Sequence, residues 1–300
     1  RGTASGSLPR DPFAPLFDST VQDGDINFAL NSGTSVTIAT TAPNGNSTGG
    51  DIGFGEGVLI NVNTGTVPVD FNLQAWRSIF GFGTSILSTG APLNVNFAAG
   101  LSGESGTINY NGQIQTNGGN VTMSALGNEF ASCAICMNST LINTIGTAGG
   151  GNVNLTVPAP GTNPGGGAFT SAGVNLGSTD IFAGSGDVNI SGYSQNGTGV
   201  QLDGTLFIGE GRLGTITTTS GDIHITGVGA FSSNSSNAPG HGVVISNARL
   251  SSESGNIAVR GLRQAGTTPG TGVLLQNGAQ ILATGTGDIE VTGEALGGGT

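Results

Sequence analysis

A seven-residue motif recurs at a nearly constant spacing in the C-terminal half of the chain. It begins with Gly followed by Asp or Asn, alternates apolar and polar residues, and ends with Gly. Its copies span 186–192, 221–227, 255–261 and 287–293, so their starts are 35, 34 and 32 residues apart (221 − 186, 255 − 221 and 287 − 255). A repeat of this length is typical of solenoids, in which one supersecondary unit stacks on the next. The alternation within each copy predicts a short strand with one buried face.

Weaker copies of the motif extend the repeat toward the N-terminus. Together with the four regular copies they give nine starts, at 24, 50, 91, 119, 151, 186, 221, 255 and 287. Between starts, a Gly-Val-x-Leu pattern and a Thr/Ser-rich apolar pattern also recur, as in 242–245 and 249–252. Three short strands in each unit of roughly 33 residues predict an all-β fold, a parallel β-helix (solenoid) of about nine coils.

Equivalent apolar positions of successive coils are expected to form two ladders inside this solenoid. Neighbouring coils would lie about 4.8 Å apart, the spacing of hydrogen-bonded strands. Each buried Ile or Val would contribute roughly 1.5–3 kcal/mol before the loss of entropy is counted. The first ladder comprises Val188, Ile223, Ile257 and Ile289, and the second comprises Ile190, Ile225, Val259 and Val291.

The chain divides into two unequal parts. Residues 1–20 are rich in Pro and Phe and predict an extended arm or a cap. Residues 21–300 carry the repeats, which are most regular in 186–293. The best candidate for a helix is 71–82, around Trp76. Both ends of the sequence are expected to be cuts from a longer protein, because neither resembles a signal peptide or a finished repeat.

The composition excludes several classes of partner. The chain has 57 Gly in 300 residues, and its 7 Arg and no Lys against 18 acidic residues give a net charge of −11. Such a surface repels phosphate backbones, so no nucleic-acid partner is expected, and it offers no basic patch to anionic lipids. No run of 18 apolar residues occurs, so we expect no membrane-spanning segment.

The only two cysteines, Cys133 and Cys136, have C-x-x-C spacing. Zinc would need four ligands, and the histidines lie far along the chain. A thioredoxin-like redox site would need a βαβ context, which the pattern lacks. The spacing therefore favours a small disulfide in an oxidising compartment, with free buried thiols as the alternative.

The second residue of the motif forms a row of Asp and Asn. Stacked carboxylates could bind Ca²⁺, a cation that takes oxygen ligands. Asp and Asn also bond to turn backbone and form ladders between identical turns, and the mixture of the two favours this structural role. The candidate calcium ligands are Asp187, Asp222 and Asp288, and apart from this ion no cofactor is expected.

Catalytic residues are not predicted. Glycoside hydrolysis needs two carboxylates about 5–10 Å apart across a cleft. The candidates on outward positions are Glu290 beside Asp288, and Asp203 with Glu210. The histidines, His224 and His241, have no nucleophile near them in the sequence, so no triad is expected.

The order of the three patterns resembles the repeat regions of bacterial exoproteins similar to filamentous haemagglutinin. Gly-Asp-Ile-x-Ile-x-Gly is followed by Gly-Val-x-Leu and then by a Thr/Ser strand. Residues 186–293 match this order best, 21–185 match it loosely, and 1–20 do not match it. The resemblance implies a right-handed parallel β-helix on a secreted or surface-displayed adhesin, often exported through an outer-membrane partner. It implies no functional residue.

The sequence thus predicts an extracellular structural or adhesive β-helix at the bacterial cell surface or in a biofilm matrix, and not an enzyme. It would serve as a shaft or fibre segment, and function would come from a long rigid body with repetitive polar faces. Its expected partners are itself or flanking repeats, joined end to end, and host or matrix glycans. Two alternatives stay open: a polysaccharide lyase or hydrolase on the same scaffold, and a phage-type fibre segment.

Overall fold

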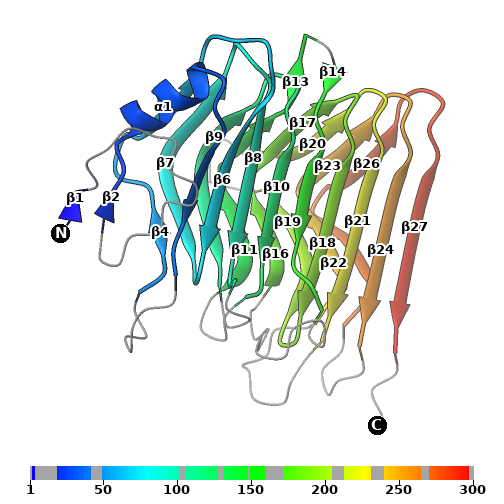
Figure 1. Ribbon diagram of the computed structural model, residues 1–300. Coiled ribbons are helices and arrows are strands. Elements are labelled where there is room, and N and C mark those ends of the chain that lie inside the picture. The colour runs from blue at the N-terminus through cyan, green and yellow to red at the C-terminus, as the bar shows by residue number, and fades with distance from the viewer. Residues whose placement is uncertain are drawn as a thin grey trace, which may run out of the picture.

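A computed structural model of the 300-residue chain describes residues 2–3, 19–41, 49–101, 106–127, 132–147, 149–159, 172–204, 213–230, 240–264 and 270–296. Within these ranges the protein is nearly all β, with one helix, α1 (Asp23–Asn31). The stack of strands runs from α1 at one end to β27 at the other (Figure 1). Both large sheets are parallel, as the solenoid class predicted from the repeats requires.

One large sheet has nine strands and holds the motif copies. Each strand pairs in parallel with its counterpart from the neighbouring repeat, and the order along the sheet follows the chain. The strands are β3 (Val36–Ala39), β6 (Val69–Ala75), β8 (Leu93–Ala99), β10 (Val121–Ala125), β15 (Val153–Thr156), β18 (Val188–Ser194), β21 (Ile223–Gly229), β24 (Ile257–Arg263) and β27 (Ile289–Ala295).

The other large sheet has fourteen strands and holds the two remaining strand patterns. They are β4 (Ile52–Gly53), β5 (Leu59–Val62), β7 (Ile79–Ser88), β9 (Ile108–Gln115), β11 (Cys133–Asn138), β12 (Leu141–Asn143), β16 (Ala172–Gly177), β17 (Asp180–Gly184), β19 (Thr198–Asp203), β20 (Gly214–Thr218), β22 (Val243–Ser246), β23 (Ala248–Ser252), β25 (Val273–Gln276) and β26 (Gln280–Ala283). Two small pairs complete the described strands: β1 (Gly2–Thr3) with β2 (Ser19–Thr20), and β13 (Ile145–Gly146) with β14 (Gly149–Gly150).

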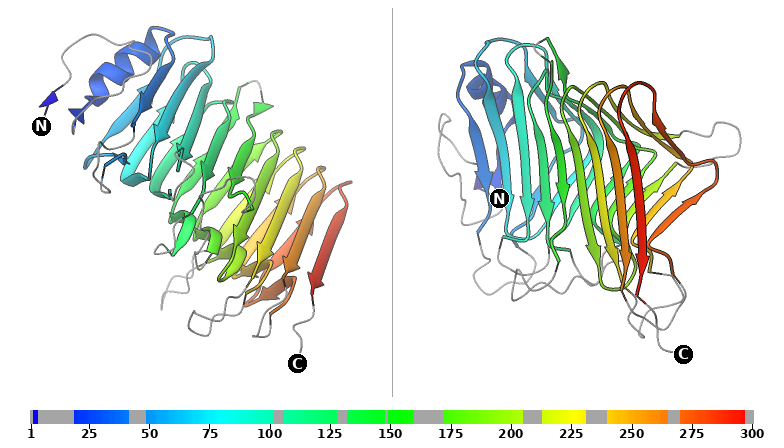
Figure 2. Two further views of the ribbon diagram at one scale, coloured as in Figure 1. Left: turned by 60° about the horizontal axis from the view of Figure 1, so that its bottom comes forward. Right: turned by 90° about the vertical axis from the view of Figure 1, so that its right-hand side faces the viewer.

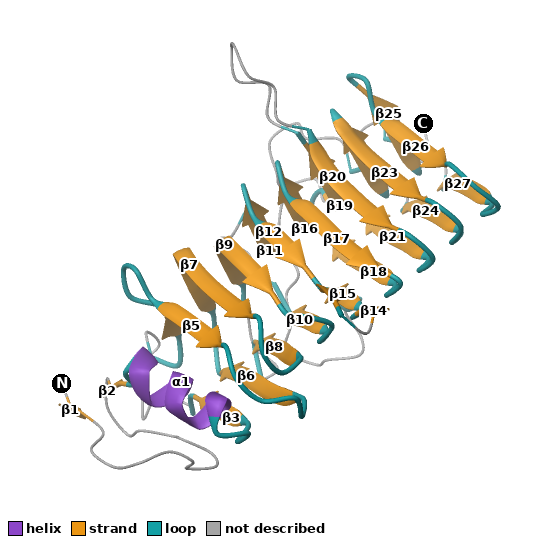
Figure 3. Ribbon diagram, turned by 90° about the horizontal axis from the view of Figure 1, so that it is seen from above, coloured by secondary structure: helices purple, strands orange, loops and turns teal. Residues whose placement is uncertain are grey.

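Three strands in each repeat, as predicted, describe the C-terminal part of the stack. Strands β18, β19 and β20 pair with β21, β22 and β23, which pair in turn with β24, β25 and β26 (Figure 3). The N-terminal part differs, because the single strand β9 pairs with both β11 and β12. In later repeats two strands take the place of β9, and the chain bends between them at one residue with a left-handed φ. These residues are Ser139 (52°), between β11 and β12, and its counterparts Ser178 (46°), Asn247 (48°) and Asn277 (52°).

The structure places the eight predicted ladder residues in register. In the first ladder, Val188 pairs with Ile223, Ile223 with Ile257, and Ile257 with Ile289. In the second ladder, Ile190, Ile225, Val259 and Val291 follow one another in the same way. Ile289 and Val291 are 46% and 43% exposed, whereas their neighbours in the ladders are buried. The difference arises because β27 is the last strand of its sheet.

Aromatic side chains pack together in the N-terminal part of the core. Phe71 and Phe97 belong to the two ladders and pack edge to face, with ring centroids 6.4 Å apart. The ring of Phe97 also lies 6.0 Å from that of Tyr110, which comes from β9 in the opposite sheet. The buried Tyr110 hydroxyl donates to the backbone carbonyl of Thr84 at 3.1 Å, and burial raises the pKa of this phenol. The two sheets therefore meet directly around one aromatic cluster.

The prediction of a helix over 71–82 is wrong. These residues form most of β6, a bend at 76–78, and the start of β7. Alternating burial along β6 places Val69, Phe71 and Leu73 inside, which is the period of a strand.

The first predicted motif copy, over 24–28, is instead part of α1. Among the described residues the nine-stranded sheet has no strand before β3, and Ile26, Ala29 and Leu30 all face the core with the i, i+3, i+4 spacing of a helix. Two acidic residues, Asp23 and Asp25, lie in its first turn, where the helix dipole favours negative charge. Helix α1 thus covers the N-terminal end of the core, as both Figure 1 and Figure 2 show.

Helix α1 also covers the backbone edge of β5. The Asn27 side chain donates to the carbonyl of Leu59 and accepts from the N–H of Asn61, at 2.9 and 2.7 Å. One helical turn later, the Asn31 side chain donates to the carbonyl of Asn61 and accepts from the N–H of Asn63, at 2.7 and 2.9 Å. Four residues of helix and two residues of strand both span about 6–7 Å, so two side-chain amides can replace a neighbouring strand.

The second predicted start, at 50, is also wrong for the nine-stranded sheet. Its residues form β4, which pairs with β7 in the fourteen-stranded sheet. The nine-stranded sheet begins instead with β3 and β6, whose sequences lack the Gly-Asp opening of the motif. Of the predicted arm or cap at 1–20, residues 1 and 4–18 lie outside the described residues.

Candidate functional site

The outer face of the nine-stranded sheet has a hollow near its C-terminal end. It measures about 470 Å³ and is lined by His224, Thr226, Asn256, Ile257, Ala258, Arg260, Asp288 and Glu290. The register of β21, β24 and β27 places His224, Ala258 and Glu290 in one outward row. The hollow exists because the short side chain of Ala258 stands between two longer ones.

An ion pair lies beside the hollow. Nη2 of Arg260 is 3.2 Å from both carboxylate oxygens of Glu290. Both side chains are mostly exposed, at 61% and 57%, so the pair contributes at most about 1 kcal/mol to stability. It leaves guanidinium, carboxylate, imidazole and hydroxyl groups open to solvent, a set suited to hydroxyl-bearing ligands such as glycans.

Two carboxylates of the hollow come from one strand segment. Asp288 and Glu290 are two residues apart and lie on the same side of β27, so their backbone positions are separated by about 6.6 Å. The structure therefore brings together His224, Asp288 and Glu290 of the predicted candidates. Asp203 lies on β19 in the other sheet, and Glu210 lies outside the described residues.

The other histidine occupies a different place. Nδ1 of His241 accepts a hydrogen bond from the backbone N–H of Thr271 at 3.1 Å and lies 2.9 Å from the Thr271 hydroxyl. Burial, followed by the nearby positive charge of Arg263, lowers the pKa of His241. The hydrogen bond from the Thr271 N–H to the neutral His241 ring joins two neighbouring repeats, so His241 has a structural role.

Sequence reasoning missed Arg260 and Thr226 as members of the hollow. The signal was available, because the motif copies align Thr226 with Arg260 just as they align His224 with Ala258. Reading the outward positions across copies, in place of one copy at a time, would have identified both.

The predicted Asp/Asn row is a continuous hydrogen-bonded ladder. In each step the Oδ1 atom of one residue accepts from the backbone N–H of the equivalent residue in the next repeat. The donor and acceptor pairs are Asn120 to Asn94 (2.9 Å), Asn152 to Asn120 (2.8 Å), Asp187 to Asn152 (2.8 Å), Asp222 to Asp187 (2.9 Å), Asn256 to Asp222 (2.6 Å) and Asp288 to Asn256 (3.0 Å). The calcium candidates Asp187 and Asp222 thus have one oxygen bound to backbone.

In the described chain, no three His, Cys, Asp or Glu side chains gather as a metal site would require. The row itself explains why Asp and Asn are interchangeable, since both offer an Oδ1 acceptor and backbone supplies the donor.

Replacing one member of this ladder gives a direct test of its role. Asp222→Ala removes the acceptor for the N–H of Asn256, and we expect the free energy of unfolding to fall by about 1–2 kcal/mol in urea denaturation. Asp222→Asn keeps the acceptor, and its effect should stay within about 0.5 kcal/mol. A stabilisation by Ca²⁺ that Asp222→Asn abolishes would instead favour the calcium hypothesis.

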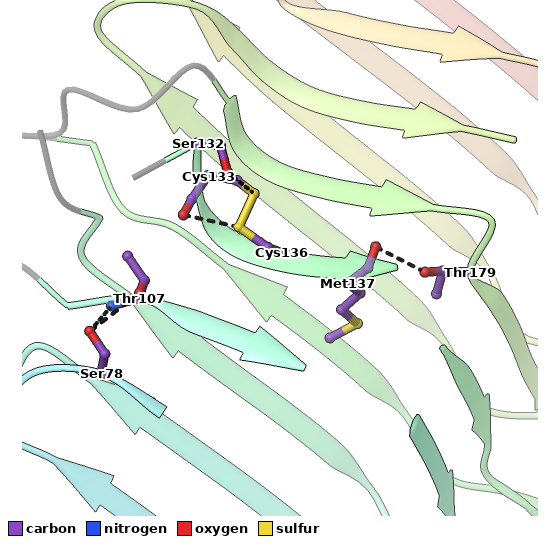
Figure 4. Close-up of a disulfide and its surroundings, with 7 residues drawn as sticks. All are labelled: Ser78, Thr107, Ser132, Cys133, Cys136, Met137 and Thr179. Atoms are coloured by element: carbon purple, nitrogen blue, oxygen red, sulfur yellow. Dashed lines mark hydrogen bonds between the residues drawn. A yellow bond between two sulfur atoms is a disulfide. The ribbon is translucent and has the colours of Figure 1, made fainter. Parts of the chain in front are cut away.

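The two cysteines form a disulfide at the start of β11. Cys133 and Cys136 have Cα atoms 5.5 Å apart, and both side chains are buried next to Ala172 of the neighbouring strand β16 (Figure 4). Further along β11, the backbone carbonyl of Met137 accepts from the Thr179 hydroxyl at 3.3 Å. The disulfide thus closes a loop of four residues where the chain enters the sheet.

No helix among the described residues combines the length and apolar character needed to cross a bilayer. Comparison of the chain with protein-family models, with curated proteins and with solved structures gives no match. A function can therefore be argued only from the chain itself.

Proposed function

We propose that this protein is an extracellular structural or adhesive shaft, built as a right-handed parallel β-helix of about nine coils. It would belong to a secreted or surface-displayed bacterial protein resembling filamentous haemagglutinin. It would hold a binding surface away from the cell or contribute to a biofilm matrix, with host or matrix glycans as partners.

The observation that carries this proposal is the register of the nine-stranded sheet. The same inward positions are apolar and the same outward positions are mainly polar in successive strands, for example in β18, β21 and β24. Each repeat therefore buries its apolar residues mainly against its two neighbours, which favours an extended rigid body over a closed globular one.

One further feature supports a location outside the cytoplasm. The Cys133–Cys136 disulfide is a bond that persists in oxidising environments.

Protease treatment of intact producing cells tests the proposed location and role. A surface shaft should be removed from intact cells by added protease, and cells lacking the gene should lose attachment to glycan-coated surfaces or matrix. A protein that resists the protease until the cells are permeabilised would contradict the proposal.

The hollow over Ala258 favours a second candidate, a polysaccharide-degrading enzyme. It combines Asp288 and Glu290 with His224 and Arg260 on one face. Incubation with a panel of polysaccharides would test this function through the release of new reducing or unsaturated ends. The enzyme hypothesis requires release by the parent protein and its loss in Glu290→Gln, with Glu253→Gln, outside the residues that line the hollow, as the matched control.

A further inference from the structure

The two ends of the stack differ in how their strand edges are treated. At the N-terminal end, side chains of α1 occupy the edge of β5 in the fourteen-stranded sheet, while β3, the first strand of the nine-stranded sheet, pairs with β6 alone among the described strands. At the other end, and within the described chain, β27 pairs with β24 on one side and with no strand on the other. An uncovered strand edge is a template for another strand, and natural proteins usually block such edges.

Three features of the C-terminal end continue the pattern of the repeats. Ile289 and Val291 hold the ladder positions and are about half exposed, and Leu275 of β25 is 47% exposed beside them. Asp288 is the last member of the Asp/Asn ladder. The described chain has no further repeat whose backbone N–H could donate a hydrogen bond to the Asp288 carboxylate. This end therefore repeats the ladder positions and the backbone edge that β24 offers to β27.

The charges of β27 limit what can bind there. Its outer positions carry Glu290 and Glu294, next to Asp288. A second copy of this end would approach as an antiparallel strand and would bring acidic residues against acidic residues. At the opposite end of another copy, α1 occupies the edge of β5, so that end cannot pair with both sheets. A strand with Asn at the ladder position and Arg on its outer face, like β24, would instead complement both the acids and the ladder.

We infer that the C-terminal end is a docking surface for one further parallel coil. This coil would place a backbone N–H on the Asp288 carboxylate, apolar side chains over Ile289 and Val291, and basic or neutral side chains near Glu290 and Glu294. The inference rests on the shaft proposed above and deepens it, because it names the end, at β27, where the shaft can be lengthened.

Adding a coil of known sequence tests this surface. Leu296 occupies the place of Gln264 and Ala230 in the preceding repeats, so a copy of residues 231–264 inserted after Leu296 supplies one full repeat with Asn256 and Arg260 correctly placed. Amide hydrogen exchange of β27 is then compared in the parent and the extended protein. We expect the β27 amides to exchange at least about tenfold more slowly in the extended protein.

The matched control carries Ile257→Asp and Val259→Asp in the added copy only. It has the same length but cannot pack on Ile289 and Val291, so its β27 amides should exchange at the parent rate. Equal exchange rates in all three proteins would overturn the inference. So would a concentration-dependent protection of β27 in the parent, which would identify a second copy as the occupant. These measurements do not depend on location or adhesion, so they can fail while the proposed function stands.

Discussion

Ile223→Asp is expected to unfold the repeats on either side of β21. Ile223 is fully buried between Val188 and Ile257, and its row offers no cation or hydrogen-bond donor to a carboxylate. A buried unpaired charge together with the lost apolar contacts should cost on the order of 5 kcal/mol, comparable to the whole stability of many domains. Limited proteolysis and urea denaturation should both detect the loss.

The neighbouring residue provides a matched control. His224 lies on the outer, solvent-facing side of the same strand, so His224→Asp also introduces an acid one position away. Its effect should stay within about 0.5 kcal/mol. If Ile223→Asp resisted protease as well as His224→Asp does, the stacked core would not be what holds the chain together.

The sequence predicted this core well in the C-terminal part and less well before it. From Leu93 onward the true strands of the nine-stranded sheet coincide with motif copies, because one Gly-Asx turn precedes nearly every one of them. Before Leu93 the sheet contains Val36 and Val69, which follow Ser35 and Pro68 and carry no such turn. The motif predicts the turn, whereas the sheet requires only the alternation of apolar residues, so strands without the turn were missed.

The helix could not be separated from the motif by local pattern. Gly24-Asp25-Ile26-Asn27-Phe28 matches the strand motif letter by letter, yet Phe28 is 73% exposed and Leu30 is buried. What decides the conformation is position, since α1 covers β5 and the described residues before it hold no repeat with which it could pair. Such a tertiary constraint is absent from a window of five residues.

The candidate site could likewise be predicted only in part from the sequence. The motif copies identify which side chains point outward, and therefore place His224 and Glu290 on one face. They give no reason to regard Ala258 as important, because its role is to be short. The hollow forms because a short side chain lies between two longer ones in the same outward row. It can be recognised only when the sequences of β21, β24 and β27 are aligned.

The first glycine of the motif should tolerate no side chain. In Gly221 a Cβ atom would point at the carbonyl group of Gly186 in the preceding repeat, far inside van der Waals distance, and the same holds for Gly255 against Gly221. The obstructing atoms are backbone and cannot rotate away. Gly221→Ala should therefore push two repeats apart and lower the free energy of unfolding by several kcal/mol, on the order of 3 or more.

Gly53→Ala is the matched control, because Gly53 is also a strand residue but has open space where its Cβ would stand. Its unfolding midpoint should remain near that of the parent in the same urea titration. Equal midpoints for the two variants would mean that the glycines serve only as turn formers and that repeats do not touch through their backbones. A large difference would explain why the Gly is the same in every motif copy from Gly119 onward while the residue after it alternates between Asp and Asn. The Gly is fixed by the space between repeats, and its neighbour only by an acceptor atom.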